Sequence, residues 1–213
     1  MKHLDSPQPP NLPYAPPDWN PQYQEQLNNV LRLYFNRLSN VTRYLLGPEG
    51  GQYINTPFGA FYDTTDQIAG STTTAYPVTI NSTTLSNGVS IENSSQITFG
   101  YDGVYNIQFS VQLSNNSNAT QDIDIWFRKN GVDIANSNSR FGLAPRKSAG
   151  DPYHVIGSLN FVDSFLADDY VQLVWRTSHV DAYIEYYAAG TSPTRPAIPS
   201  VIVTVTFVSS VPE

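Results

Sequence analysis

The sequence predicts an all-β fold, a jelly-roll sandwich that follows an N-terminal extended arm and one amphipathic α-helix. Three observations support this prediction. Prolines crowd the first 20 residues, apolar residues recur every three or four positions over residues 21–46, and from about residue 56 apolar and polar residues alternate. We therefore expect a proline-rich arm at 1–20, an amphipathic anchoring helix at 21–47 and a jelly-roll β domain at 48–213.

The arm cannot form a helix or a central strand, because its prolines fix φ and remove backbone donors. An extended, polyproline-like chain is expected instead. A disordered tail has a similar composition, but a purely solvating tail would not need Leu12, Tyr14 and Trp19. If these residues are ordered, they need a surface on which to lie, which another subunit or a host assembly would supply.

The helix has a clear start and end. Asn20 can cap it, with Pro21 at the first helical position, and Gly47-Pro48 ends it. Its apolar residues follow a heptad seam, widened on one side. The residues that we predict to serve anchoring and assembly are Leu27, Val30, Leu31, Tyr34, Phe35, Leu38, Val41 and Leu45 in the helix, with Leu12, Tyr14 and Trp19 in the arm. The helix would pack on its own β domain, join a three-stranded coiled coil or dock on a partner.

The remainder of the chain reads as eight or more short strands separated by polar turns, which is typical of a sandwich or jelly roll. The clearest alternation lies in 97–113, and Asn130-Gly131 is a strong hairpin signal after the strand around Ile123–Phe127. Segments 155–161 and 170–175 are expected to pair across the turn that separates them. An aromatic strand at 182–188 and a terminal strand at 201–208 complete the pattern.

Composition excludes several classes of function. The net charge is −7, which argues against nucleic-acid binding, and no apolar run approaches the roughly 20 residues that span a bilayer. The first residues lack the apolar core of a signal peptide, and there is no cysteine. Synthesis and assembly in a bacterial cytoplasm are therefore expected. Only 14 % of residues are charged, against roughly 25 % in average domains, which suits a protein packed among copies or partners.

No catalytic residues stand out, and we expect a protein that is not an enzyme and that has no cofactor or metal. His3, His154 and His179 are far apart and lack a second ligand at metal-binding spacing. Asp122 and Asp124 point to one strand face, where a weak Ca²⁺ contact is possible but a solvated face is more common. The enzyme hypothesis therefore has no residues to support it.

Aromatic residues make up 13 % of the chain, and three of them cluster near one strand. Because side chains alternate along a strand, Tyr183, Tyr186 and Tyr187 cannot all face the core. Exposed tyrosines are typical of interfaces. We therefore predict a possible interface at Tyr183, Tyr186 and Tyr187, with core packing as the alternative.

Segment 103–109, Gly-Val-Tyr-Asn-Ile-Gln-Phe, resembles the Gly-x-Tyr-x-Phe-x-Phe/Tyr signature of C1q/TNF-like domains, with Ile107 in place of the first Phe. The hairpin at 128–131, the segment 170–173 after an acidic turn and the terminal strand at 202–207 follow in the family's order. Over residues 56–209 the resemblance implies a ten-stranded jelly roll that trimerises around apolar and aromatic inner faces. It implies no ligand site.

The whole chain is also similar to virion structural proteins of tailed phages, especially those of marine and cyanobacterial hosts. The similarity is carried by segments 11–16, 26–36, 51–53 and 58–67. It implies a component of the phage particle.

These observations lead to one main hypothesis and to alternatives. The main hypothesis is a homotrimeric capsid decoration or head-fibre protein, anchored on other virion proteins of the capsid, neck or tail through its arm and helix. Alternatives are a tail-associated adaptor or receptor-binding protein with a host-surface receptor, or a free C1q/TNF-like module that binds a sugar or another ligand. Neither nucleic acid nor a membrane is an expected partner.

Overall fold

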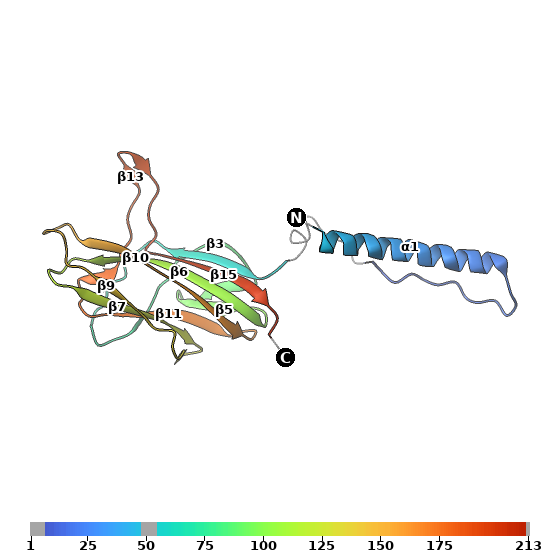
Figure 1. Ribbon diagram of the computed structural model, residues 1–213, viewed down its shortest axis with the longest axis horizontal. Helices are drawn as coiled ribbons and strands as arrows, with labels where there is room; N and C mark the ends of the chain where they lie inside the picture. The colour runs from blue at the N-terminus through green and yellow to red at the C-terminus, as the bar shows by residue number, and fades with distance from the viewer. Residues whose placement is uncertain (1–6, 48–54, 212–213) are drawn as a thin grey trace. The chain divides into compact units, whose positions relative to one another are not determined.

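The computed structural model describes residues 7–47 and 55–211, and the chain divides between Asn55 and Thr56 into two compact units (Figure 1). The first unit contains the arm and the helix α1. The second is a β-sandwich. The expected boundary of the β domain at residue 48 and the first six residues of the arm lie outside the described residues.

The helix α1 spans Pro21–Leu46 and begins as expected from its cap. The Asn20 side chain accepts hydrogen bonds from the backbone N–H groups of Gln22 and Tyr23, at 2.9 and 3.3 Å. At the other end, Gly47 is extended, as expected for a residue before proline. The described part of the arm runs alongside α1 in the opposite direction (Figure 1). Within the described residues, no helix combines the length and the apolar character needed to cross a membrane.

Two antiparallel sheets form the sandwich, and we name them sheet A and sheet B. Sheet A contains, in spatial order, β10 (Tyr153–Phe165), β6 (Gly103–Asn115), β15 (Val201–Ser209), β1 (Phe58–Asp63) and β3 (Ser82–Asn87), with β12 (Ala182–Ile184) beside the end of β6. Sheet B contains β4 (Val89–Glu92), β5 (Gln96–Phe99), β11 (Tyr170–Thr177), β7 (Gln121–Lys129) and β8 (Val132–Asp133), with β2 (Tyr76–Pro77) beside β11 and β9 (Ser139–Leu143) beside β7. A short hairpin of β13 (Gly190–Thr191) and β14 (Thr194–Arg195) projects from the sandwich (Figure 1). The predicted all-β sandwich with one helix is confirmed.

The core lies between the sheets and is made by every second residue of the long strands. Along β6, Tyr105, Ile107, Phe109, Val111 and Leu113 are fully buried. Stacked aromatic pairs join the two sheets, since the Phe127 ring of β7 lies 4.4 Å from that of Phe161 on β10. This alternation leaves one outward face on each sheet, and these two faces are accessible to other molecules.

One expectation about strand pairing and one about strand length were wrong. Segments 155–161 and 170–175 are consecutive strands, but β10 pairs with β6 in sheet A and β11 pairs with β7 in sheet B. The turn between them, in which Asp168 has φ +67°, therefore crosses from one sheet to the other. The expected strand at 182–188 is also shorter, because β12 ends at Ile184 and Tyr187 makes a single bridge to Ile198.

Candidate functional site

The apolar stripe of α1 is not buried within the described residues. The structure describes every residue of α1, and none of them is buried. Leu27, Val30, Leu31, Tyr34 and Val41 are half-exposed. The other stripe residues are exposed, and so is the apolar part of the arm: these are Phe35, Leu38, Leu45, Leu12, Tyr14 and Trp19.

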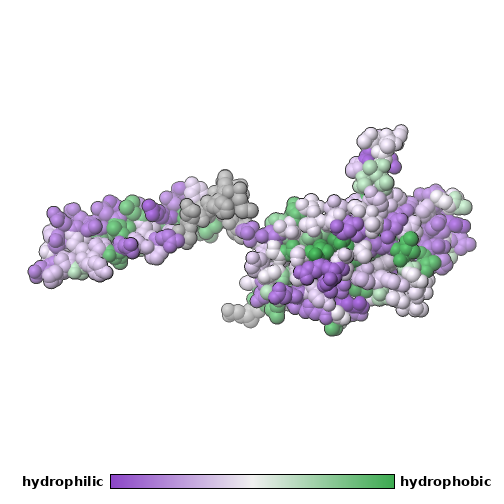
Figure 2. Space-filling view, turned by 180° about the vertical axis from the view of Figure 1, so that it is seen from behind, coloured by the Kyte–Doolittle hydropathy of each residue, from purple (hydrophilic) through white to green (hydrophobic). Residues whose placement is uncertain are grey.

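The described part of the arm and α1 enclose a hollow. Gln8, Pro9 and Pro10 line a hollow of about 280 Å³ together with Val30, Leu33, Tyr34 and Arg37 of the helix. In the view of Figure 2 the helix unit is mostly hydrophilic, with hydrophobic residues gathered in restricted patches. The described part of the arm thus lies against part of the apolar stripe.

The outward face of sheet A carries no formal charge on its strands. We call this surface the uncharged face and define it by the outward residues of four adjacent strands. They are Phe58, Ala60 and Tyr62 of β1, Ile202, Thr204, Thr206 and Val208 of β15, Val104, Asn106, Gln108, Ser110, Gln112 and Ser114 of β6, and His154, Ile156, Ser158, Asn160, Val162 and Ser164 of β10. None is Asp, Glu, Lys or Arg, although 14 % of the whole chain is charged.

Apolar residues and an unsatisfied polar atom lie within this face. Ile156, Val162 and Ile202 are exposed large apolar side chains on it. The Asn106 Oδ1 atom is buried and has no hydrogen-bond partner among the described residues. Depletion of charge, together with exposed aliphatic groups, is the compositional pattern of an interface core. The uncharged face is therefore the best candidate for a contact between subunits.

The free edge of β10 borders the uncharged face. Among the described strands β10 pairs only with β6, so the other edge of this 13-residue strand presents unpaired backbone groups. Its inward residues Val155, Leu159 and Phe161 are only half-buried. A long and partly apolar edge strand is normally covered in a stable protein. This edge and the uncharged face form one continuous candidate interface.

The predicted tyrosines are brought partly together at one end of this face. Tyr183 on β12 lies opposite Ser114 of β6, which in turn lies opposite His154 of β10. The Tyr187 hydroxyl donates to Glu185 at 2.5 Å and hydrogen-bonds with His154 Nδ1 at 2.6 Å, and the Tyr183 hydroxyl donates to Glu185 at 3.3 Å. Tyr186 lies apart from this network, with its backbone N–H bound to Asp66. All three tyrosines are half-buried.

The electrostatics of this cluster keep its hydroxyls protonated. Burial, followed by the hydrogen bond to Glu185, raises the pKa of Tyr187 far above its ordinary value. Burial and the Glu185 charge likewise raise the pKa of Tyr183. Protonated phenols can donate and accept hydrogen bonds, and they are poor nucleophiles, so the cluster is a candidate polar contact at the end of the uncharged face.

The outward face of sheet B is charged, and Asp124 is at its centre. Arg140 binds one carboxylate oxygen of Asp124 through Nε at 2.7 Å, and Arg176 binds the other through Nε at 2.8 Å. These partners, Arg140 first, lower the pKa of Asp124. Asp122 lies on the same face, 4.0 Å from Arg140. Both carboxylates therefore face arginines, and in the described part of the chain no group of three or more metal-ligating side chains gathers.

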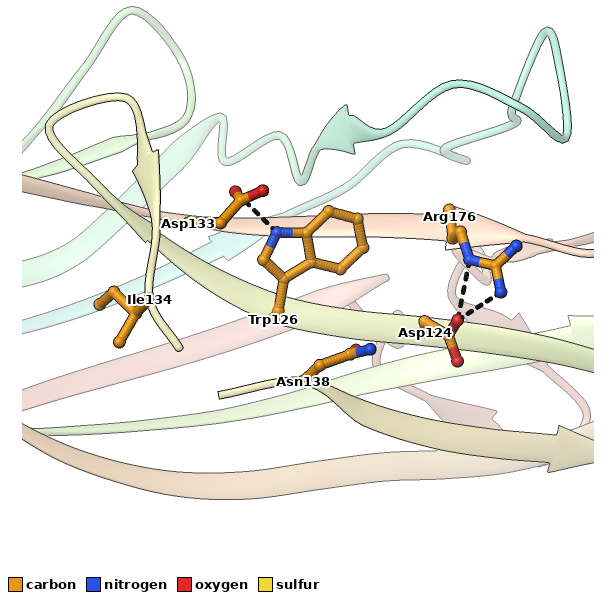
Figure 3. A pocket seen from close by; sticks show the side chains of 6 residues that line it. All are labelled: Asp124, Trp126, Asp133, Ile134, Asn138 and Arg176. Carbon is orange, nitrogen blue, oxygen red and sulfur yellow. Dashed lines mark hydrogen bonds and ion pairs between the residues drawn. The ribbon is translucent and has the colours of Figure 1, made fainter. Parts of the chain in front are cut away.

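The sequence did not predict the pocket that lies beside this ion-pair network. Asp124, Trp126, Asp133, Ile134, Asn138 and Arg176 line a hollow of about 290 Å³ on sheet B (Figure 3). The signal was the outward series Asp122, Asp124, Trp126 and Arg128, at a spacing of two along β7. A tryptophan within a charged outward series lies outside the core, and tryptophan is enriched at binding surfaces, so this face is a candidate binding surface.

Comparison with known proteins identifies no family. No protein-family model matches the chain. No curated protein is similar to it at a significant level. Support for a function therefore comes from the uncharged face, the apolar stripe of α1 and the pocket beside Trp126.

Proposed function

We propose that this protein is a structural, non-enzymatic component of a phage particle, a homotrimer that assembles through the uncharged face and is held on other virion proteins by its arm and α1. Capsid decoration or a head fibre is the favoured place in the particle, assembled in the cytoplasm of the bacterial host. The uncharged face is the observation that carries this proposal.

The uncharged face supports this proposal because its residues cost little free energy to desolvate. A sheet face exposed to water normally carries charged residues, and the other outward face of this sandwich does so. The outward residues of four adjacent strands carry no formal charge, so these side chains can lose their water without the desolvation of an ion among them. Three copies placed around one axis would cover this face and the free edge of β10 together.

The strand arrangement supports a C1q/TNF-like identity for the sandwich. The segment that resembles the family signature forms β6, the strand between β10 and β15 in sheet A. In the family that the sequence resembles, trimers form around apolar and aromatic inner faces. Sheet A has Tyr62 and Phe58 on its outward face and the Tyr183 cluster at one end. Sheet A is therefore the sheet that we place at the three-fold axis.

Residues 7–47 support the anchoring part of the proposal. A helix with exposed Phe35, Leu38 and Leu45 leaves apolar surface in water, and each such side chain gains about 1.5–3 kcal/mol when it is fully buried. Residues 8–10 of the arm lie against the middle of α1. Contact with capsid, neck or tail proteins, or with the helices of sister subunits, would bury the remaining stripe.

Trimerisation is tested by multi-angle light scattering on the full chain. The expected mass is three times 23.6 kDa. A chain that stays monomeric at micromolar concentration would refute assembly through the uncharged face.

Anchoring is tested by exchanging two stripe residues in the phage that encodes the chain. The double substitution Leu31→Asp with Leu38→Asp should remove the protein from purified particles, as measured by mass spectrometry, and leave the melting of the sandwich unchanged. Asn29→Asp with Asn36→Asp is the matched control, since it has the same spacing on the polar side of α1. Equal incorporation of both variants would refute anchoring through the stripe.

A ligand-binding module, including a tail-associated receptor-binding protein, is the second candidate function. The Trp126 pocket on sheet B favours it. Separated head and tail fractions of the particle distinguish the two, because a decoration protein will be found with the heads.

A further inference from the structure

The pocket around Trp126 has the features of a built recognition site. The indole Nε1 donates to Asp133 Oδ1 at 2.8 Å, and Arg128 Nε donates to the same oxygen at 2.6 Å. These bonds hold the ring in one orientation. Figure 3 shows Asp133 at one edge of the indole and the Asp124–Arg176 pair beyond the other edge. Asn138 lies near the indole, on the side away from Asp133. The aromatic surface is thus surrounded by polar groups.

Several polar groups of the pocket are available for a ligand. The amide of Asn138 makes no hydrogen bond to the described residues, and Asn138 is exposed. Asp133 uses Oδ1 for both of its donors, which leaves Oδ2 as an acceptor. Arg176 uses Nε and Nη2 on Asp124, which leaves Nη1 as a donor. Donors and acceptors therefore alternate around one aromatic ring.

The charges at this surface cancel. Arg128, Arg140 and Arg176 oppose Asp122, Asp124 and Asp133, and every one of these arginines already contacts a carboxylate. A phosphate, a sulfate or an acidic sugar would find no spare positive charge. A neutral ligand with many hydroxyl groups meets no such penalty.

We propose that the Trp126 pocket binds an uncharged saccharide. The apolar C–H face of one pyranose ring lies on the indole, and its hydroxyls bond with Asn138, Asp133 Oδ2 and Arg176 Nη1. A volume of about 290 Å³ is at the lower end of ligand sites, which suits a terminal sugar or a disaccharide. The side chains of this pocket point outward from sheet B, so the site stays open when sheet A forms the contact between subunits.

The three tryptophans of the chain allow a direct test. Trp19 lies in the arm and is 77 % exposed, Trp126 lines the pocket, and Trp175 is buried in the core. Full-length protein labelled with ¹⁵N in its indoles is titrated with maltose, lactose and chitobiose, and with sialyllactose as the acidic comparison. At least one uncharged sugar should shift the Trp126 signal in a saturable way and leave the Trp175 signal unchanged.

Variants tie the binding to this pocket. Asn138→Ala should weaken the affinity about tenfold, since it removes an exposed side chain that makes hydrogen bonds with the sugar only. Isothermal titration calorimetry measures binding in every variant, because Trp126→Ala removes its own indole signal; Trp126→Ala should abolish binding, and Trp19→Ala should leave it intact. If Trp126→Ala does not fold, Asn138→Ala still tests the site, because Asn138 is exposed.

Three results would overturn the proposal: no uncharged sugar moves the Trp126 signal, sialyllactose binds more tightly than lactose, or both pocket variants bind as well as the unaltered chain. None of these results alters the mass found by light scattering. Failure of the saccharide site is therefore distinguishable from failure of the proposed trimer.

Discussion

The two outward faces of the sandwich are built by the same alternation but differ in charge. On sheet B, Asp124 and its arginine partners form a ladder across β9, β7 and β11. On sheet A, the outward residues of β10, β6, β15 and β1 carry no formal charge. The inward faces of both sheets supply apolar residues to one core. The core residues therefore account for the fold, whereas the outward residues give the two sheets different surfaces, and the proposed subunit contact depends on that difference.

The largest effect on stability is expected on sheet B, from Asp124→Ala. The Asp124 side chain is only 4 % exposed and binds two guanidinium groups. Removing it takes the shared carboxylate from Arg140 and Arg176, and only Arg140 keeps another acidic neighbour, Asp122 at 4.0 Å. This should lower the free energy of unfolding by about 3 kcal/mol. Urea denaturation of the full chain, at one protein concentration, measures this loss.

A matched substitution on sheet A is the control for that measurement. Ser110→Ala, at the middle of β6, should change the free energy of unfolding by less than about 0.5 kcal/mol. Similar losses in both variants would mean that the faces do not differ energetically, and the comparison would fail.

The next effect concerns assembly and is expected from Gln108→Glu. Gln108 lies between Asn160 of β10 and Thr204 of β15, at the centre of the uncharged face. The substitution keeps the shape and adds one negative charge per subunit, so the trimer would bring like charges together. We expect the trimer to weaken by about 2 kcal/mol, a roughly 30-fold change in dissociation constant measured by light scattering on dilution.

Gln172→Glu is the control on the charged face. Gln172 points outward on β11 and lies opposite Arg128, which can neutralise the new carboxylate. Its trimer should dissociate like that of the unaltered chain. If Gln172→Glu disrupts assembly and Gln108→Glu does not, the subunit contact lies on sheet B and our assignment of the faces is reversed.

Sequence patterns predicted much of the fold and little of the pairing. The alternation within 97–113, the Asn130-Gly131 turn, the Asn20 cap and the extent of α1 all followed from local rules, and the alternating stretch contains β5 and most of β6. Period two indicates which residues share a face, but it does not indicate which strands adjoin. A four-residue turn after β10 is compatible both with a hairpin and with a crossing to the other sheet, and the structure has the crossing.

The candidate sites show the same limit. The shared face of Asp122 and Asp124 was predictable, whereas the partners of Asp124 lie 16 and 52 residues away in sequence. His154 reaches Tyr187 from 33 residues away. Each strand of the uncharged face could be read as uncharged by itself. The outward residues of these four strands form one uncharged surface only because the strands are neighbours in sheet A.

A smaller effect is expected from pH, and it also belongs to sheet B. Arg140 and Arg176 lower the pKa of Asp124, and Arg128 and Trp126 lower the pKa of Asp133. A carboxylate whose pKa falls on folding stabilises the native state above its unfolded pKa of about 3.9 and loses that contribution as pH drops towards the folded value. The free energy of unfolding should therefore fall as the pH drops below about 4.

Asp124→Asn tests the origin of that slope. The variant has no carboxylate to titrate at this position, so its stability should vary less with pH over the same window. Urea denaturation at several pH values gives both slopes. An unchanged slope would show that acid sensitivity arises elsewhere, and sheet B would lose its electrostatic role in the comparison.

The smallest effect is expected from Arg128→Gln, which breaks the exposed ion pair beside the Trp126 pocket. The Asp133 side chain is 54 % exposed, so water already solvates it, and the Trp126 indole still donates to it when Arg128 is gone. Exposed pairs of this kind contribute about 0.2–1 kcal/mol, against about 3 kcal/mol for the buried Asp124. The free energy of unfolding should thus fall by less than about 1 kcal/mol in urea. A loss above about 2 kcal/mol would mean that the charged face acts as one cooperative network, in which Asp133 and Asp124 depend on each other across the Trp126 ring.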